Sequence, residues 1–384
     1  MDLTYSAREE QFRQEARTWL QVNVPAQPLP SGDTRSGFAE HLHWERHLFQ
    51  AGWSVVSWPR EYGGRDADLW QWLIFEEEYY RAGAPQRVTQ NGIFLLAPTL
   101  FQFGTEEQRD RILPRMAAAD DLWCQAWSEP GAGSDLAGLI SRATRDDAAG
   151  GWLLNGQKTW STRGAFCTHA FGLFRSAAPA DSERQRHRGL TYFMVPLDAP
   201  GVTVRGFSRL DGDEGFADLF FSDVFVPDRD VLGAVHDGWR VAMATTGSER
   251  GLTLRSPGRF RASFERLCDL ARSRPGGVTE RLADRLVSSW LDVEAYARYT
   301  EQTVTRIVDG VELGAQSSLN KLHWSELDIS LHELALELLG PQAVLDGPWT
   351  KGYQFSLSGP IYAGTNEIQR DIAAERLLGL PRSR

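Results

Sequence analysis

The chain has 384 residues, and at about 100–200 residues per domain this length predicts two or three domains. Hydrophobic residues make up 42% and charged residues 24% of the chain, which is typical of a globular protein with a sizeable core. The 41 basic and 51 acidic residues give a net charge of −10, which argues against a general nucleic-acid or anionic-membrane binder, because both classes need a basic surface.

The N-terminus lacks a basic segment followed by an apolar one, so we expect no signal peptide. No apolar run approaches the roughly 20 residues of a membrane span. Cys124, Cys167 and Cys268 lie far apart and form no CxxC pair, so we expect neither a disulfide framework nor a structural zinc site. These features together predict a cytoplasmic protein.

Residues 1–121 are predicted to be helical. Ser6 and Glu9 form a capping-box pattern ahead of an amphipathic run, and Thr105 and Gln108 repeat it later. Each pattern marks the beginning of a helix, so we expect an N-terminal α-helical domain.

The hydrophobic pattern changes to that of strands over residues 122–235. Residues 152–162 predict a β-hairpin whose tight turn is Asn155-Gly156. Two further β-rich runs are bounded by Gly, Pro and Asp, at residues 190–197 and 218–226. We therefore expect a middle domain that is a small antiparallel β-barrel or sandwich.

Residues 236–384 return to helix. A long helix is predicted by apolar positions spaced alternately by four and three residues: Leu286, Trp290, Val293, Ala297, Thr300, Val304 and Ile307. This spacing indicates the seam of a helical bundle, and Gly310 ends the run.

The segment at residues 127–135 reads Trp-Ser-Glu-Pro-Gly-Ala-Gly-Ser-Asp. Its glycines allow a ligand to approach the backbone, and its hydroxyls and turn amides can bind phosphate or ring heteroatoms. Taken alone, the segment is equally consistent with a Gly-rich turn between domains.

Two further segments, residues 155–162 and 361–370, follow in the same order as the helical, β and helical parts. Together the three segments resemble the acyl-CoA dehydrogenase family of flavoproteins over nearly the whole chain. The resemblance implies an α+β multidomain fold with an N-terminal helical domain, a middle β domain and a C-terminal four-helix bundle. It also implies FAD as the cofactor and an acyl-CoA thioester as the substrate.

The resemblance implies a role for particular residues of this chain. Trp160 would pack on the isoalloxazine face, and Thr162 would hydrogen-bond at flavin N5. The whole set implied to bind FAD is Gln125, Trp127, Ser128, Gly133, Ser134, Trp160, Thr162, Thr365, Asn366 and Glu367. The set implied to bind the substrate is Ser134, Arg250, Ala363 and Gly364.

The catalytic base is where the sequence departs from many family members. They carry a glutamate where this chain has Ala363, whereas the isovaleryl-type branch places the base before an arginine, as in Glu249-Arg250. We therefore expect Glu249 to take the α-proton while the β-carbon passes hydride to flavin N5. A buried carboxylate suits this task because burial raises its pKa. The alternative is that Glu249 only pairs with an arginine.

The family also implies partners. An electron-transfer flavoprotein or an equivalent acceptor would reoxidise the flavin, and the chain would form a homodimer or homotetramer. No histidine lies in a metal-ligand spacing, so no metal is expected. Two alternatives stay open: a flavin-dependent oxidase or monooxygenase on the same fold, and one subunit of a hetero-oligomeric acyl-CoA dehydrogenase.

Overall fold

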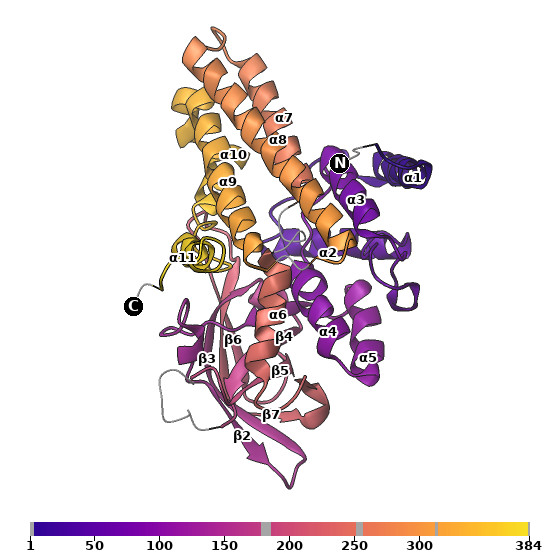
Figure 1. Cartoon of the computed structure of the whole chain (residues 1–384), viewed down its shortest axis with the longest axis vertical. Helices are drawn as coiled ribbons and strands as arrows, with labels where there is room; N and C mark the ends of the chain where they lie inside the picture. Colours follow the sequence, from indigo (N-terminus) through magenta and orange to yellow (C-terminus); the bar gives the residue numbers. More distant parts are fainter. Residues whose placement is uncertain (1–3, 178–185, 251–255, 312–313, 383–384) are drawn as a thin grey trace. The chain divides into compact units, whose positions relative to one another are not determined.

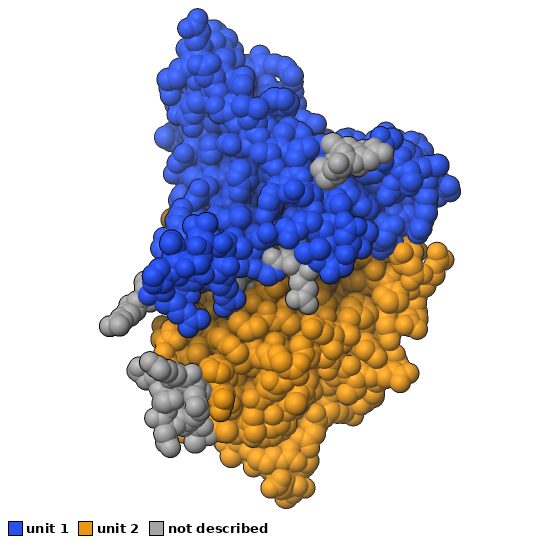
Figure 2. All heavy atoms as spheres, viewed as in Figure 1, with its two compact units in different colours: residues 1–28, 67–84, 250–384 blue, residues 29–66, 85–249 orange. Residues whose placement is uncertain are grey.

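The computed structural model describes residues 4–177, 186–250, 256–311 and 314–382, with the backbone alone at residues 248–250 (Figure 1). The chain forms two compact units (Figure 2). Unit 1 comprises Met1–Pro28, Ala67–Ala84 and Arg250–Arg384, and unit 2 comprises Leu29–Asp66 and Pro85–Glu249. The helices of the N-terminal region are thus divided between the units, and the domain boundaries at residues 121 and 235 stay predictions.

Unit 1 is helical. Its helices are α1 (Ala7–Asn23), α3 (Leu69–Arg81), α7 (Pro257–Ser273), α8 (Glu280–Val308), α9 (Ser317–Leu339), α10 (Pro348–Ser356) and α11 (Asn366–Arg376). Helices α7, α8 and α9 pack against one another, and α10 and α11 pack on α9; α7 and α8 run side by side in Figure 1. The capping box at Ser6 and Glu9 is present at the start of α1, as predicted.

The predicted seam of α8 is only partly right. Val293, Ala297 and Val304 are buried, but Trp290 is 49% exposed, and its neighbour Ser289 occupies the inward face instead. A spacing of 3.5 residues drifts by about 20° per heptad around a straight α-helix. Apolar positions that face the bundle in the middle of this 29-residue helix therefore turn toward solvent near its ends.

Unit 2 combines helices with one large sheet. Its helices are α2 (Arg35–Gln50), α4 (Ala97–Phe103), α5 (Glu106–Ala117) and α6 (Gly238–Arg250), of which only the last residue of α6 is counted in unit 1. Its strands are β1 (Trp123–Ala126), β2 (Arg142–Asp146), β3 (Gly151–Thr162), β4 (His169–Arg175), β5 (Leu190–Pro196), β6 (Val202–Phe207), β7 (Phe216–Pro227) and β8 (Val231–Leu232). The predicted capping box at Thr105 and Gln108 begins α5.

The strand order is β6-β7-β3-β2-β4-β5-β8, and β1 pairs with β4. Most neighbours are antiparallel, as predicted, but β4 pairs in parallel with β1 and with β2. Alternate residues of β4 enter two different hydrophobic clusters: Phe171 and Leu173 join one, and Ala170 and Phe174 join the other. Because side chains alternate across a strand, each face of the sheet has its own core here.

The predicted turn at Asn155-Gly156 is wrong. Both residues lie inside the continuous strand β3, and the hairpin between β2 and β3 turns at residues 147–150. The register against β7 shifts between Leu154 and Gly156, so the glycine marks an irregularity in a strand. A Cβ at position 156 would lie 2.2 Å from Ser141 Oγ, so this position needs glycine because of a close approach.

Candidate functional site

The Gly-rich segment begins directly after β1 and forms a tight turn. The backbones of Glu129 and Ala132 exchange two hydrogen bonds, of 2.9 and 3.0 Å, with Pro130-Gly131 at the tip. Gly131, Gly133 and Ser134 are exposed, and a Cβ added at either glycine would meet nothing within 4 Å. This leaves an open edge of backbone amides and a hydroxyl, which suits a phosphate or a ring edge.

Trp160 lies beside this turn on strand β3. The register against β7 shifts again between Lys158 and Ser161, and Trp160 has the left-handed φ of 60°. Its ring packs edge-on against Phe207 and Phe216, yet the residue is 60% exposed. A strained backbone and a large exposed indole are both unfavourable in isolation. They are explained if a flat ligand covers the indole.

The turn and the strand are tied together. The backbone N–H of Thr159 donates to the carbonyl of Ser128 at 2.9 Å. Thr162, half-buried, ends the same strand two residues after Trp160. Gln125 lies half-buried in β1, and the buried indole N–H of Trp127 has no hydrogen-bond partner among the described residues. Unit 2 therefore brings together the predicted residues from Gln125 to Thr162.

A buried ion pair lies beneath this surface, and the sequence reasoning missed it. Lys158 Nζ lies 2.8 Å from Glu129 Oε1 and donates also to the carbonyl of Trp127 at 3.2 Å. Burial lowers the pKa of Lys158 to about 8, against the opposing effect of Glu129. Burial raises the pKa of Glu129, but Lys158 and the N–H of Ile140 outweigh it and leave that pKa below its ordinary value. The sequence did offer one signal for this ion pair, which is the charged Lys158 two positions before Trp160.

A second buried cluster at the end of β3 was also missed. Asp33 accepts hydrogen bonds from Arg163 at 2.7 Å and from Arg209 at 2.6 Å. Arg163 directly follows Thr162 and has a left-handed φ of 55°. The sequence holds no local signal for this contact, because Asp33 and Arg163 are 130 positions apart.

The predicted residues of the C-terminal segment lie in unit 1. Thr365 caps α11 by accepting the N–H of Ile368 at 3.3 Å, and Glu367 is exposed in its first turn. The buried Asn366 Oδ1 accepts from Lys321 Nζ at 2.7 Å and from Ser325 Oγ at 3.1 Å.

The turn before α11 is fixed by its own backbone. Gln369 Nε2 donates to the carbonyls of Ala363 and Gly364, at 3.0 and 3.3 Å. Both residues have left-handed φ values. Glu249 and Arg250 end helix α6, but their side chains lie outside the described part of the chain. The predicted base is therefore located by its helix alone.

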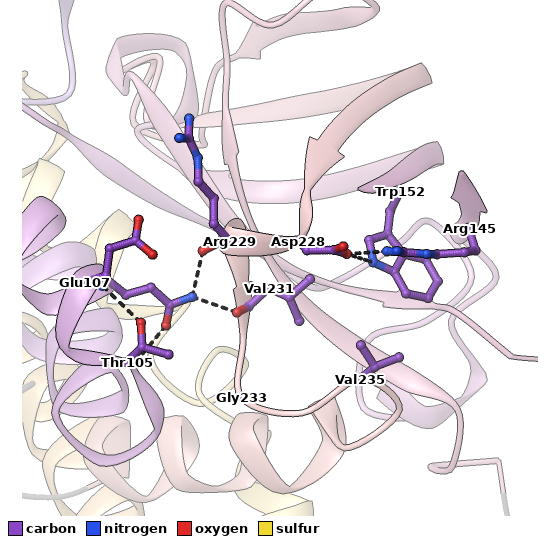
Figure 3. Close-up of a pocket in the computed structure, with 10 residues that line it drawn as sticks. Thr105, Glu107, Arg145, Trp152, Asp228, Arg229, Val231, Gly233 and Val235 are labelled. Atoms are coloured by element: carbon purple, nitrogen blue, oxygen red, sulfur yellow. Dashed lines mark hydrogen bonds and ion pairs between the residues drawn. The ribbon is translucent and has the colours of Figure 1, made fainter. Parts of the chain in front are cut away.

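A cavity of about 500 Å³ in unit 2 is separate from these residues. It lies where the beginning of α5 meets the segment after β7. Figure 3 shows Asp228 between the Arg145–Trp152 pair and the backbone around Val231. Trp152 Nε1 donates to Asp228 at 3.1 Å, and the Arg145 guanidinium lies over the Trp152 ring. None of the predicted site residues lines this cavity.

Comparison with known proteins identifies the class. Sequence profiles of the acyl-CoA dehydrogenase N-terminal, middle and C-terminal domains match residues 6–120, 124–224 and 236–378. The acyl-CoA dehydrogenase IpdE1 of Mycobacterium tuberculosis (strain ATCC 25618 / H37Rv) is 38% identical, over 97% of this chain and 98% of that protein. The chain therefore belongs to the acyl-CoA dehydrogenase family.

Solved structures agree with this family assignment. A steroid acyl-CoA dehydrogenase, Tcur3481-Tcur3483, superposes with a TM-score of 0.87 at 26% identity over the whole of both chains. The ChsE4-ChsE5 complex from Mycobacterium tuberculosis gives 0.84 at 27%, also over both chains. The protein is accordingly an oxidoreductase with acyl-CoA dehydrogenase activity, in a family that generally binds FAD. These relatives support the family and not the isovaleryl branch in particular.

The residues present fit a flavin dinucleotide. An exposed indole offers a face for a flat ring. Two hydroxyl-bearing residues lie on the neighbouring backbone: Ser128, whose carbonyl accepts from Thr159, and Thr162 at the end of β3. The exposed amides and hydroxyl around Gly133 and Ser134 suit a phosphate. None of the helices in the described ranges is long and apolar enough to cross a membrane.

Proposed function

We propose that the chain oxidises an acyl-CoA thioester to the trans-2-enoyl-CoA, with Glu249 as the base. The observation that best supports an FAD site in unit 2 is the exposed, left-handed Trp160 beside the open Gly-rich turn. The family resemblance supplies the cofactor-binding roles proposed for Gln125, Ser128 and Thr162, which lie on β1, on the turn after it and on β3 of the same unit.

The chain's own groups have distinct tasks in this reaction. Glu249 takes the α-proton, and the N–H of Ala363 polarises the thioester carbonyl as an oxyanion hole does. Arg250 and Gly364 contribute to the acyl-CoA channel. Ser134 binds a phosphate of the FAD pyrophosphate or of CoA. FAD, when bound, accepts the hydride from the β-carbon and passes its electrons to an electron-transfer flavoprotein or an equivalent acceptor.

Glu249→Gln tests the base. The variant should keep the yellow flavin absorbance but lose the bleaching of that absorbance by acyl-CoA under anaerobic conditions. Glu265→Gln, on the exposed face of helix α7, makes the same change in charge and should bleach normally. Bleaching of Glu249→Gln at the wild-type rate would overturn the assignment. Oxygen consumption without another acceptor would point to an oxidase instead.

The acyl group that we infer is steroid-derived. The support is the likeness to a solved acyl-CoA dehydrogenase described as acting on steroids, at 26% identity over the whole chain. A panel of acyl-CoA thioesters, scored by dye reduction, should favour a steroid-derived acyl group over straight chains of four to sixteen carbons. Equal or better turnover of a straight-chain thioester would contradict this substrate class.

A hetero-oligomer is the second candidate, in place of a homodimer or homotetramer. Tcur3481-Tcur3483 and ChsE4-ChsE5 are each described as two different chains. On helix α8, Val287, Trp290 and Leu291 are 57%, 49% and 55% exposed, and their i, i+3, i+4 spacing puts them on one face. Two samples distinguish a hetero-oligomer from a homo-oligomer: the chain purified alone, and the chain coexpressed with an unlike acyl-CoA dehydrogenase subunit. The mass and the flavin content are measured for each. One FAD per chain in a homo-oligomer would contradict it.

A further inference from the structure

We infer that Glu129 and Lys158 are positioning residues that hold the Gly-rich turn and Trp160 together as one cofactor-binding surface. This inference rests on the proposed FAD site in unit 2. Neither side chain is exposed at that surface, since Lys158 is fully buried and Glu129 nearly so. They act through the backbone segments that they join.

The Lys158 ammonium joins strand β3 to the beginning of the turn. It donates to the Trp127 carbonyl and to the Glu129 carboxylate, and it lies 4.9 Å from the centre of the Phe174 ring. Charge-assisted hydrogen bonds of this kind are shorter and roughly twice as strong as neutral ones. The position of β3 and the entry to the turn are therefore fixed relative to each other.

The Glu129 carboxylate joins the entry of the turn to its exit. Its two oxygens accept the backbone N–H groups of Ile140 at 2.7 Å and Ser141 at 3.0 Å, in addition to Lys158. Gly133 and Ser134 lie in the loop between these two ends. A single carboxylate thus holds both ends of the segment that carries the predicted phosphate contacts.

The pair also bears on the strained part of β3. Lys158 pairs with Leu219 in the last regular position before the register shift, and Trp160 follows two residues later in its left-handed conformation. The hydrogen bond from Thr159 to Ser128 lies in the same interval. Fixing Lys158 therefore fixes where the distorted segment begins and where the indole is presented.

A stabilising role alone does not account for the pair. Burying two charges costs about as much as their attraction returns, so apolar residues of similar volume often give equal or greater stability. An ion pair does what apolar residues cannot, because it fixes the direction of three backbone groups: the Trp127 carbonyl and the N–H groups of Ile140 and Ser141. Orientation of this kind matters where a ligand must meet fixed donors.

The test separates cofactor binding from folding. FAD is titrated into apo-protein, the dissociation constant is read from quenching of flavin fluorescence, and stability is read from urea denaturation of the apo form. Glu129→Gln and Lys158→Met should each weaken FAD binding at least tenfold and shift the visible flavin spectrum. The double variant Glu129→Leu/Lys158→Met should recover apo stability but not FAD affinity.

Two variants serve as matched controls. Glu45 forms another buried ion pair in unit 2, with Arg87 at 2.8 Å, and Glu45→Gln should lower stability without changing FAD affinity. Glu129→Asp keeps the charge but shortens the reach to the amides. It should fold like the wild type and bind FAD several-fold more weakly, which covers the case in which Glu129→Gln does not fold.

The outcomes distinguish this inference from the proposed function. If Trp160→Ala binds FAD as tightly as the wild type, the proposed site itself is wrong. If Trp160→Ala loses FAD while Glu129→Gln and Glu129→Asp bind it normally, the site stands and the positioning role is wrong. Recovery of both stability and FAD affinity in the double variant would also overturn the positioning role.

Discussion

Asp33 and Arg163, 130 positions apart in the sequence, form a buried ion pair with 2.7 Å between Oδ1 and Nε. The second oxygen of Asp33 accepts from Arg209, which also holds Asp211. Burial alone would raise the pKa of Asp33, but Arg163 and Arg209 outweigh it and lower that pKa. The loop around Asp33 is thereby fastened to the residue that follows Thr162, at the edge of the proposed flavin site.

Asp33→Asn should lower the free energy of unfolding by about 3–5 kcal/mol, because it leaves the buried Arg163 guanidinium without its counter-charge. Urea denaturation measures this change. The control is Asp66→Asn, which removes an exposed pairing with Arg60, where the side chains are 55% and 79% exposed; its cost should stay below about 1 kcal/mol. Equal costs for the two variants would show that the buried pair contributes no more than a surface pair.

The same pair predicts a pH dependence. The folded-state pKa of Asp33 lies below its unfolded value of about 3.9, so the unfolded chain takes up the proton first as pH falls. The stability that Asp33 contributes is thus fully present above the unfolded pKa and is lost as pH falls toward the folded one. Between pH 5 and pH 3, the wild type should lose more unfolding free energy than Asp33→Asn. Parallel pH profiles would contradict this.

Local patterns in the sequence predicted what is local in the structure. The capping boxes at Ser6 and Thr105 were readable because both partners lie within one helical turn. Asn155-Gly156 misled because an irregularity within a strand and a hairpin turn favour the same residues. Contacts between distant segments, such as Asp33 with Arg163, have no period or spacing that a single sequence reveals. For the buried pair of Glu129 and Lys158, the sequence showed a charged residue near Trp160 but not its partner. Sequence segments and the family resemblance predicted the candidate site residues, but not the buried ion pairs beneath them.

Trp160→Ala should weaken FAD binding without much change in stability. The indole is 60% exposed and contributes little to the core. Stacking a flat ring on an aromatic side chain is worth about 1–3 kcal/mol in nucleobase systems, so affinity should fall roughly fivefold to 150-fold. Trp160→Phe should lose less. Phe225→Ala, at a 40% exposed aromatic of β7, should leave FAD affinity unchanged, and a similar loss in that variant would contradict the stacking role.

Asn366→Ala should destabilise unit 1 by about 1.5–3 kcal/mol, the range for losing a hydrogen bond to a charged group. The buried Lys321 ammonium would lose the Asn366 oxygen that lies 2.7 Å from it. Glu367→Gln, at the exposed neighbouring position, should change stability much less than Asn366→Ala does. Thermal and urea denaturation measure both. If the two variants unfold alike, Asn366 does not anchor the C-terminal motif.

The cost of Glu129→Gln should itself depend on pH. Lys158 has a pKa of about 8 in the folded chain against an ordinary 10.5, so it loses its proton in the folded state well before the unfolded chain does. The attraction between Glu129 and Lys158 requires the ammonium charge, and Arg175 is a further charged group under the influence of the Glu129 carboxylate. The loss of unfolding free energy in Glu129→Gln should therefore be large at pH 6.5 and shrink as pH rises through 8 to 9.5.

Glu45→Gln is the control. Arg87, the partner of Glu45, stays charged over this range, so the stability that Glu45→Gln loses should stay constant. A cost of Glu129→Gln that is equal at all three pH values would mean that the charge of Lys158 does not hold the pair together.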